Sequence, residues 1–211
     1  MNSNRRLSAA IASLPSFISF LFLLSLAWDA PALGTEPAES AGTLVLVARP
    51  ELSDPLYGQS ILVAREVSGN QHVGFILNKP TGVKLGDAFP GHEATKAVAD
   101  PLYLGGPAEL NVLFALVQSK TAPEDGAVGL AEDLYLAISN TAVINAMSPG
   151  ESDQSRFFVG AVVWGPGELA AEIKFGAWYV LEATADLVLT KNTAGLWEKL
   201  VQQAEMVANG I

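Results

Sequence analysis

Few side chains in this chain could act as acids, bases, nucleophiles or metal ligands. The sequence has 211 residues, of which two are histidine and none is cysteine. His72 lies in an apolar pattern typical of a strand, so we interpret it as a packed or edge residue. His92-Glu93 lacks the second histidine, four residues after the first, that a zinc protease motif requires. We therefore predict no catalytic residue and no metal site.

The motifs of nucleophilic and nucleotide-dependent enzymes are also missing. No serine stands in a Gly-x-Ser-x-Gly elbow, and the 19 glycines form neither a phosphate-binding loop nor a dinucleotide fingerprint. We therefore predict no cofactor. The acidic clusters Glu124-Asp125, Glu132-Asp133 and Glu151-Ser152-Asp153 do not match the spacing of a calcium loop, and we interpret them as solvated surface.

Two Gly/Pro corners and one tryptophan could bind a ligand or partner instead. Asn78-Lys79-Pro80 could present an amide and an ammonium at a strand tip, although an Asn turn before a proline is the favoured interpretation. Gly105-Gly106-Pro107 could form a nest of open N–H groups, but we favour a corner that needs a positive φ angle. Trp164 could be a recognition aromatic or a core residue, and both interpretations stay open.

We hypothesise that the two corners share one rim of the fold. Lys79 would then orient an anionic or carbonyl-bearing ligand beside the amides of Gly105 and Gly106, as a lone cation in an acidic chain. The candidate binding residues are Asn78, Lys79, Pro80, Gly105, Gly106, Pro107 and Trp164.

The elements that must position these residues are mostly strands. Apolar runs predict strands at 43–48, 60–67, 72–77, 102–104, 112–117, 134–138, 157–164, 179–183 and 187–189. Helical spacing predicts helices at 85–89, 141–147, 168–175 and 196–208. The turn at 68–71 predicts a β-hairpin, whereas Pro80 should end its strand. Ser139 or Asn140 is the expected N-cap of its helix, and Gly210 would follow the last helix. Many strands without β–α alternation predict an α+β fold.

Composition limits the classes of partner. With 22 acidic and 12 basic residues the formal net charge is −10, so the chain repels phosphate backbones and anionic membrane surfaces. We expect no nucleic-acid partner. Half of the residues are hydrophobic, which is enough for one sizeable core in a single domain.

The N-terminus is typical of an export signal. Arg5-Arg6 is followed by an apolar stretch at 14–28 and by Ala30-Pro31-Ala32, whose small residues suit a signal peptidase. We predict a signal peptide at 1–32, a linker at 33–41 and one domain at 42–211. The alternative is an uncleaved membrane anchor through residues 14–28. The expected location is periplasmic or secreted.

Three motifs, in order, resemble the AlgH/YqgE family of small bacterial proteins. The matching positions are Gly74, Asn78 and Pro80; then Gly105, Gly106 and Pro107; then Trp164, Pro166, Gly167, Leu169, Glu172 and Ile173, with Trp178 after them. The resemblance covers nearly all of the chain after residue 42. It implies a mixed sheet that closes partly into a barrel with packed short helices, and it implies no settled biochemical activity.

The chain departs from the family pattern at three points. The strand after Gly-Gly-Pro ends at Gln118 where the family usually has a histidine, so no role of that histidine carries over. Glu168 stands where the family commonly has glutamine. The N-terminal leader is also a departure, because relatives generally look cytoplasmic. The family name derives from a regulatory effect on alginate production, which implies a regulator.

The resemblance and the missing catalytic motifs favour a non-enzymatic binding or regulatory module that acts on a protein or small ligand. One alternative is a hydrolase-like enzyme with an anion site at Asn78 and Gly105-Gly106. Another is a DNA-binding transcriptional regulator, which the acidity and the leader disfavour.

Export predicts a processed N-terminus. Since the small residues end at Ala32, sequencing of the mature protein should begin near Leu33. Intact protein starting at Met1 in the membrane fraction would favour the anchor. The same intact terminus in a soluble cytosolic fraction would contradict export.

Overall fold

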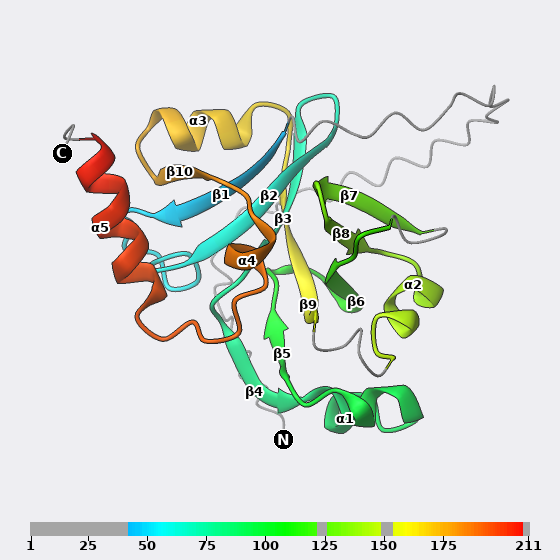
Figure 1. Ribbon diagram of the computed structural model, residues 1–211. Coiled ribbons are helices and arrows are strands. Elements are labelled where there is room, and N and C mark those ends of the chain that lie inside the picture. The colour runs from blue at the N-terminus through cyan, green and yellow to red at the C-terminus, as the bar shows by residue number, and fades with distance from the viewer. Residues whose placement is uncertain (1–41, 122–125, 149–153, 209–211) are drawn as a thin grey trace, which may run out of the picture. The chain divides into compact units, whose positions relative to one another are not determined.

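The computed structural model describes residues 42–121, 126–148 and 154–208 (Figure 1). The predicted signal peptide or anchor, the linker at 33–41 and Gly210 lie outside the described residues. Among the described helices, none is both long enough and apolar enough to span a membrane.

Ten strands form one mixed sheet. Their bounds are β1 Thr43–Ala48, β2 Ile61–Ser68, β3 Gln71–Ile76, β4 Pro80–Lys84, β5 Pro101–Leu104, β6 Ala108–Gln118, β7 Ala127–Ala131, β8 Leu134–Ala137, β9 Ser155–Trp164 and β10 Trp178–Glu182. The main order in space is β10-β1-β2-β3-β9-β6-β8-β7, with every neighbouring pair antiparallel. β4 pairs with β5, and β5 pairs in parallel with β9.

β9 is the central strand because it pairs with three others. Its first part pairs with β6 and β5, and its last residues, Val162 to Trp164, pair with β3. Gly160 stands close to the boundary between these two parts, at the irregularity in the β6–β9 pairing, with φ of 74°. That conformation suits glycine and lets the strand bend from one half of the sheet into the other. The nearly continuous apolar sequence of β9 fits a strand with few exposed positions.

The sheet curls until its two ends approach each other. The carbonyl oxygen of Leu130 in β7 accepts hydrogen bonds from Thr43 Oγ1 of β1 at 2.5 Å and from Arg65 Nη1 of β2 at 3.3 Å. Side chains therefore bridge the gap where a closed barrel would have ladder bonds. The predicted α+β fold with a mixed, partly barrel-like sheet and short helices is confirmed.

Short helices cover the curled sheet. Their bounds are α1 Leu85–Ala88, α2 Asn140–Asn145, α3 Glu168–Lys174, α4 Ala185–Val188 and α5 Leu196–Ala208, with a 3₁₀ turn η1 at Glu93–Ala97. In Figure 1, α3 and α5 lie beside β10 and β1, whereas α2 lies beside β8. Trp197 fastens α5 to the sheet, since its indole N–H donates to the carbonyl oxygen of Ala48 at 2.8 Å.

Most predicted elements are confirmed. The β2–β3 hairpin, α5 and the Ser139 cap of α2 are present, and Ser139 Oγ accepts from the backbone N–H of Ala142 at 3.1 Å. Periodicity and capping were sufficient to predict these elements, because the residues that determine each element lie within it or directly beside it.

Two strands were not predicted, and one predicted strand is absent. Strand β3 ends at Ile76, as the break before Pro80 predicts, but Pro80 itself begins strand β4, which tolerates proline because it pairs on one side only, with β5. Residues 187–189 are not a strand, because Thr184 caps helix α4 and its Oγ1 accepts from Leu187 N at 3.4 Å. Strand β7 was missed because its short sequence, AVGLA, contains a glycine.

Gly105 and Gly106 are required by a close backbone crossing rather than by a positive φ angle. Neither residue has positive φ, so that part of our interpretation is wrong. A Cβ atom on Gly105 would lie 2.2 Å from the carbonyl oxygen of Gly160, and one on Gly106 would lie 2.3 Å from the carbonyl of Ala161. Only a residue without a side chain permits this approach to β9.

We expect Gly105→Ala to destabilise the fold by about 1–3 kcal/mol or more, because the clash is with backbone atoms. Gly91→Ala is the matched control, since a Cβ there meets nothing within 4 Å and should change stability by less than about 0.5 kcal/mol. Urea unfolding followed by tryptophan fluorescence measures both. Equal unfolding midpoints for the two variants would refute the crossing argument.

Candidate functional site

The two Gly/Pro corners singled out in the sequence are neighbours in space. The backbone N–H of Ile76 donates to the carbonyl oxygen of Gly105 at 2.8 Å, and that of Leu104 donates to the carbonyl oxygen of Lys79 at 3.0 Å. The end of β3 and the end of β5 therefore lie side by side. Whether the corners bind a ligand stays a prediction.

The polar groups of these corners are largely engaged in holding the chain together. Asn78 Oδ1 accepts from the backbone N–H of Ile61 at 2.9 Å, and Asn78 Nδ2 donates to the carbonyl oxygen of Gln59 at 2.8 Å. The backbone N–H of Gly105 donates to the carbonyl oxygen of Val159 at 2.9 Å. Asn78 therefore fixes the start of β2, and Gly105 fixes β5 on β9.

The members of the two corners differ in exposure. Pro80 and Pro107 are exposed, Asn78 and Lys79 are half-buried, and Gly105 and Gly106 are buried. Within the part of the chain that the structure describes, Lys79 forms no ion pair; the ion pairs there join Lys96 to Glu93 and Lys191 to Asp100. None of the seven candidate residues except Trp164 lines any of the three cavities described below.

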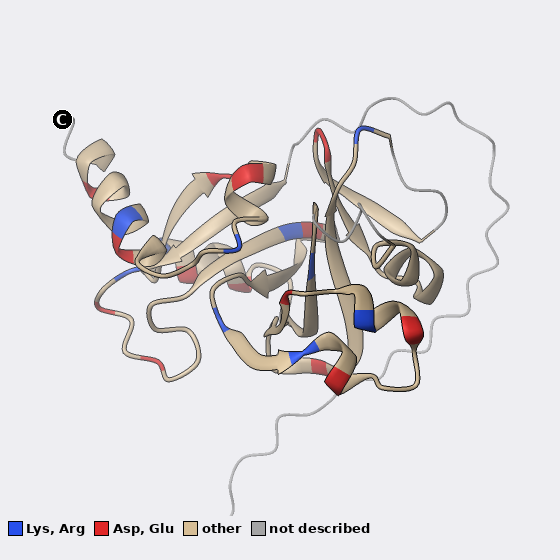
Figure 2. Cartoon of the chain, turned by 60° about the horizontal axis from the view of Figure 1, so that its bottom comes forward, with Lys and Arg blue, Asp and Glu red and all other residues tan. Residues whose placement is uncertain are grey.

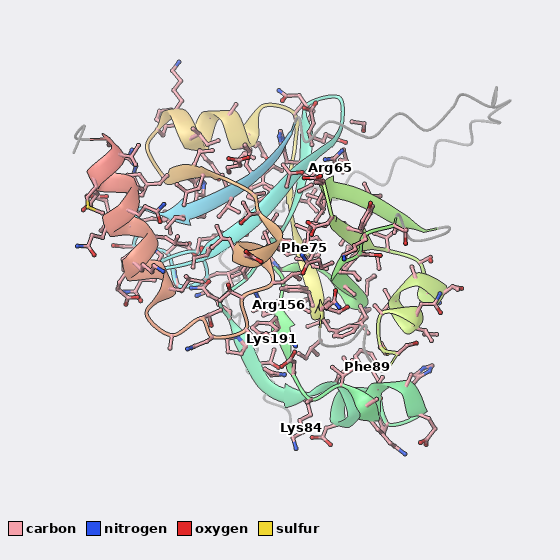
Figure 3. All side chains as sticks on the ribbon, in the orientation of Figure 1. Arg65, Phe75, Lys84, Phe89, Arg156 and Lys191 are labelled. Atoms are coloured by element: carbon pink, nitrogen blue, oxygen red, sulfur yellow. The ribbon has the colours of Figure 1, made fainter. Side chains whose placement is uncertain are left out.

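A buried arginine that the sequence did not indicate contacts the chain beside both corners. Arg156 of β9 is 0% exposed. Its Nη1 donates to the carbonyl oxygen of Val188 at 2.9 Å, and its Nη2 donates to that of Leu77, the residue before Asn78. Its Cζ lies 4.1 Å from the ring centroid of Tyr103 in β5. Figure 3 shows Arg156 and Phe75 toward the middle of the domain, whereas Lys84 lies at its edge.

The environment of Arg156 is unusual for a charged group. Burial lowers the pKa of its guanidinium from the usual value, while Tyr103 and then Asp100 act in the opposite direction. Its Nε has no hydrogen-bond partner among the described residues. The only sequence signal was one charged residue directly before the apolar run at 157–164, and its partners lie far away along the chain.

The third motif builds a groove between α3 and the sheet, which we call the α3 groove. Its volume is about 400 Å³, and it is lined by Tyr57, Val162, Val163, Trp164, Glu168, Ala171, Glu172, Phe175 and Trp178. Trp164 is 3% exposed and Trp178 is 4% exposed, so both are core residues that also form the floor of the groove. The two interpretations of Trp164 are therefore compatible.

One carboxylate organises the floor of the α3 groove. Glu172 Oε2 accepts from the indole N–H of Trp164 at 3.1 Å and from that of Trp178 at 2.7 Å. Glu168 Oε2, one helical turn earlier, accepts from the backbone N–H of Gly165 at 2.7 Å. Glu168, which stands where the resembled family commonly has glutamine, places a negative charge in the first turn of α3, where the helix dipole favours it.

The mouth of the α3 groove is aromatic and exposed. Phe175 is 88% exposed. The ring of Tyr57 stands edge-on to that of Trp178, with centroids 6.3 Å apart and an interplanar angle of 84°. Burial, and then the carboxylates of Glu172 and Asp54, raise the pKa of the Tyr57 phenol above its usual value. The negative charge of Glu172 therefore acts on Tyr57, which lines the same groove.

Two further cavities occur in the described residues. One is almost purely apolar, about 320 Å³, and lies between β2–β3 and β7–β8, with Arg65 and Glu109 among its lining residues. In Figure 3, Arg65 lies beside β7. The other, about 300 Å³, lies between the α1–η1 segment and α2, and His92 contributes to it. Residues 42–121, 126–148 and 154–208 contain no cluster of three side chains able to hold a metal ion.

The charges of the described residues do not form a basic stripe. Figure 2 shows Lys and Arg dispersed among Asp and Glu, including along the β4–α1–η1 segment in the foreground. Dispersed charges of both signs offer little to a phosphate backbone.

Gln118 stands at the position of the family's usual histidine. Its Nε2 donates to Asp133 Oδ2 at 2.6 Å.

Comparisons with known proteins agree with this architecture. The profile of a family described as AlgH-like matches residues 45–208. A UPF0301 protein of Chlorobaculum tepidum is 30% identical over 166 residues, which cover 75% of this chain and 83% of that protein.

Two solved structures share the fold. The crystal structure of protein DIP2367 from Corynebacterium diphtheriae superposes with a TM-score of 0.62 at 24% identity, covering 82% of this chain and 90% of that one. The solution structure of the AlgH protein from Pseudomonas aeruginosa gives a TM-score of 0.60 at 21% identity, covering 85% and 94%. At these identities the likeness concerns the fold alone.

Proposed function

The chain belongs to the AlgH-like family, and from that premise we propose that it is a non-enzymatic binding or regulatory module whose protein partner docks in the α3 groove. The observation that carries this proposal is the exposure of Phe175 at the mouth of a cavity floored by two tryptophans. Aromatic anchors beside a preformed pocket are typical of the centres of protein interfaces.

The rigidity of the floor supports a binding role. Trp164 and Trp178 are held by the same carboxylate oxygen, so their rings keep one orientation before any partner arrives. A preorganised surface loses less side-chain entropy on binding than a mobile one. Phe175 supplies apolar area that a docked partner would remove from water.

We propose in addition that this binding takes place outside the cytoplasm, in the periplasm or after secretion. Support comes from Arg5-Arg6, the apolar stretch at 14–28 and the small residues around Ala30 to Ala32. The partner would then be another exported or envelope protein.

The test is capture of partners from the exported fraction with purified, tagged protein. We expect Phe175→Ala to weaken capture about tenfold or more, because it removes the anchor. Its folding stability should change by less than about 0.5 kcal/mol, since the side chain is almost fully exposed.

Val207→Ala is the matched control, because Val207 is an exposed apolar residue, 75% accessible, on α5 and outside the groove. Proteins retained by the wild type and by Val207→Ala but lost by Phe175→Ala would support the proposal. A set of captured proteins that is the same for all three would overturn it.

A further inference from the structure

We propose that the α3 groove recognises a cationic side chain, the ammonium of lysine or the guanidinium of arginine, on the docking partner. This inference rests on the proposed function and adds the chemistry of the group that is bound. It is carried by the charges that line the groove and by the aromatic surfaces that enclose them.

The charge lining the groove is entirely negative among the described residues. Glu168 and Glu172 line it, and no lysine or arginine does. Each carboxylate uses Oε2 in the contacts that fix the floor, and the Oε1 atoms accept no hydrogen bond from the described residues. Neither carboxylate forms an ion pair within that part of the chain. Two acceptor atoms with negative charge are therefore free for a cation.

The enclosing surface suits a cation on an aliphatic stem. Trp164 and Trp178 both donate their indole N–H groups to Glu172, which fixes their rings beside this carboxylate in the lining of the groove. Tyr57 stands perpendicular to Trp178 and forms a second wall. Cations are attracted to such ring surfaces, and the methylene stems of lysine and arginine pack against them.

The size of the groove and the charge of the chain favour a side chain over a bare ion or an anion. A volume of about 400 Å³ is much larger than a metal ion, and the described residues include no cluster of three metal-binding side chains. An anionic group would meet two carboxylates in a chain of net charge −10. A basic segment of a partner is attracted both by the two carboxylates of the groove and by the net negative charge of the chain.

The experiment titrates the full chain with four tripeptides, acetyl-Gly-X-Gly-amide, in which X is lysine, arginine, norleucine or glutamate. The readouts are the indole N–H resonances of Trp164 and Trp178 and the dissociation constant. We expect the lysine and arginine peptides to shift both resonances. Norleucine keeps the stem of lysine without its charge, and its peptide should bind about tenfold more weakly.

Variants that remove one charge but keep the side-chain shape test whether Glu168 and Glu172 bind the cation. Glu168→Gln and Glu172→Gln keep an oxygen for the contacts to Gly165 and the two indoles, and each should weaken the lysine peptide about three- to tenfold. Glu132→Gln removes an equal charge from the exposed β7–β8 turn, outside the groove, and should leave binding unchanged.

Each contrary result overturns a distinct claim. Equal binding of the norleucine and lysine peptides with shifted indoles would overturn cation recognition and leave the groove as a docking site. Failure of every peptide to shift the indoles, while partner capture still requires Phe175, would overturn cation recognition as well. Capture of the same proteins by the wild type and by Phe175→Ala would overturn the proposed function itself.

Discussion

A buried guanidinium holds the centre of this fold. Arg156 is fully buried in the strand that pairs with three others, and it donates to backbone carbonyls at the end of β3 and in α4 while lying against Tyr103 of β5. Burying a charge without a carboxylate partner is costly, and its hydrogen bonds and ring contacts must offset that cost. Removing the guanidinium would leave two buried carbonyls unpaired, each costing about 1–3 kcal/mol.

This constraint divides the motifs into two groups. Leu77, Asn78 and Gly105 belong to the part of the chain that Arg156 and β9 hold, and their polar groups are used in fixing strands to one another. The α3 groove differs because its tryptophans and Glu172 are fixed by contacts among themselves, while Phe175 is exposed. The same family motifs therefore serve two physical purposes, since the first two fix strands to one another and the third forms the α3 groove.

The sequence was sufficient for elements whose determinants are local. The β2–β3 hairpin, the Ser139 cap and helix α5 follow from turn residues, capping and spacing within a few positions. Gly105-Gly106 was recognised as constrained, but its cause, the approach to Gly160 and Ala161, depends on residues more than fifty positions away. Arg156 and Tyr57 were missed for the same reason, since nothing near them in the sequence shows what they contact. Trp164 could not be assigned to core or surface from the sequence, whereas the structure buries it in the core beneath the α3 groove.

Amide hydrogen exchange of Arg156→Met, compared with the wild type under native conditions, tests the division between these two groups most directly. Beyond the uniform acceleration that lower global stability gives, we predict faster exchange at Leu77, Gly105 and Val188, whose segments the guanidinium holds. Exchange in α3 and β10 should follow the uniform change only. Unaltered exchange at Leu77, Gly105 and Val188, or selective opening of α3, would contradict the account.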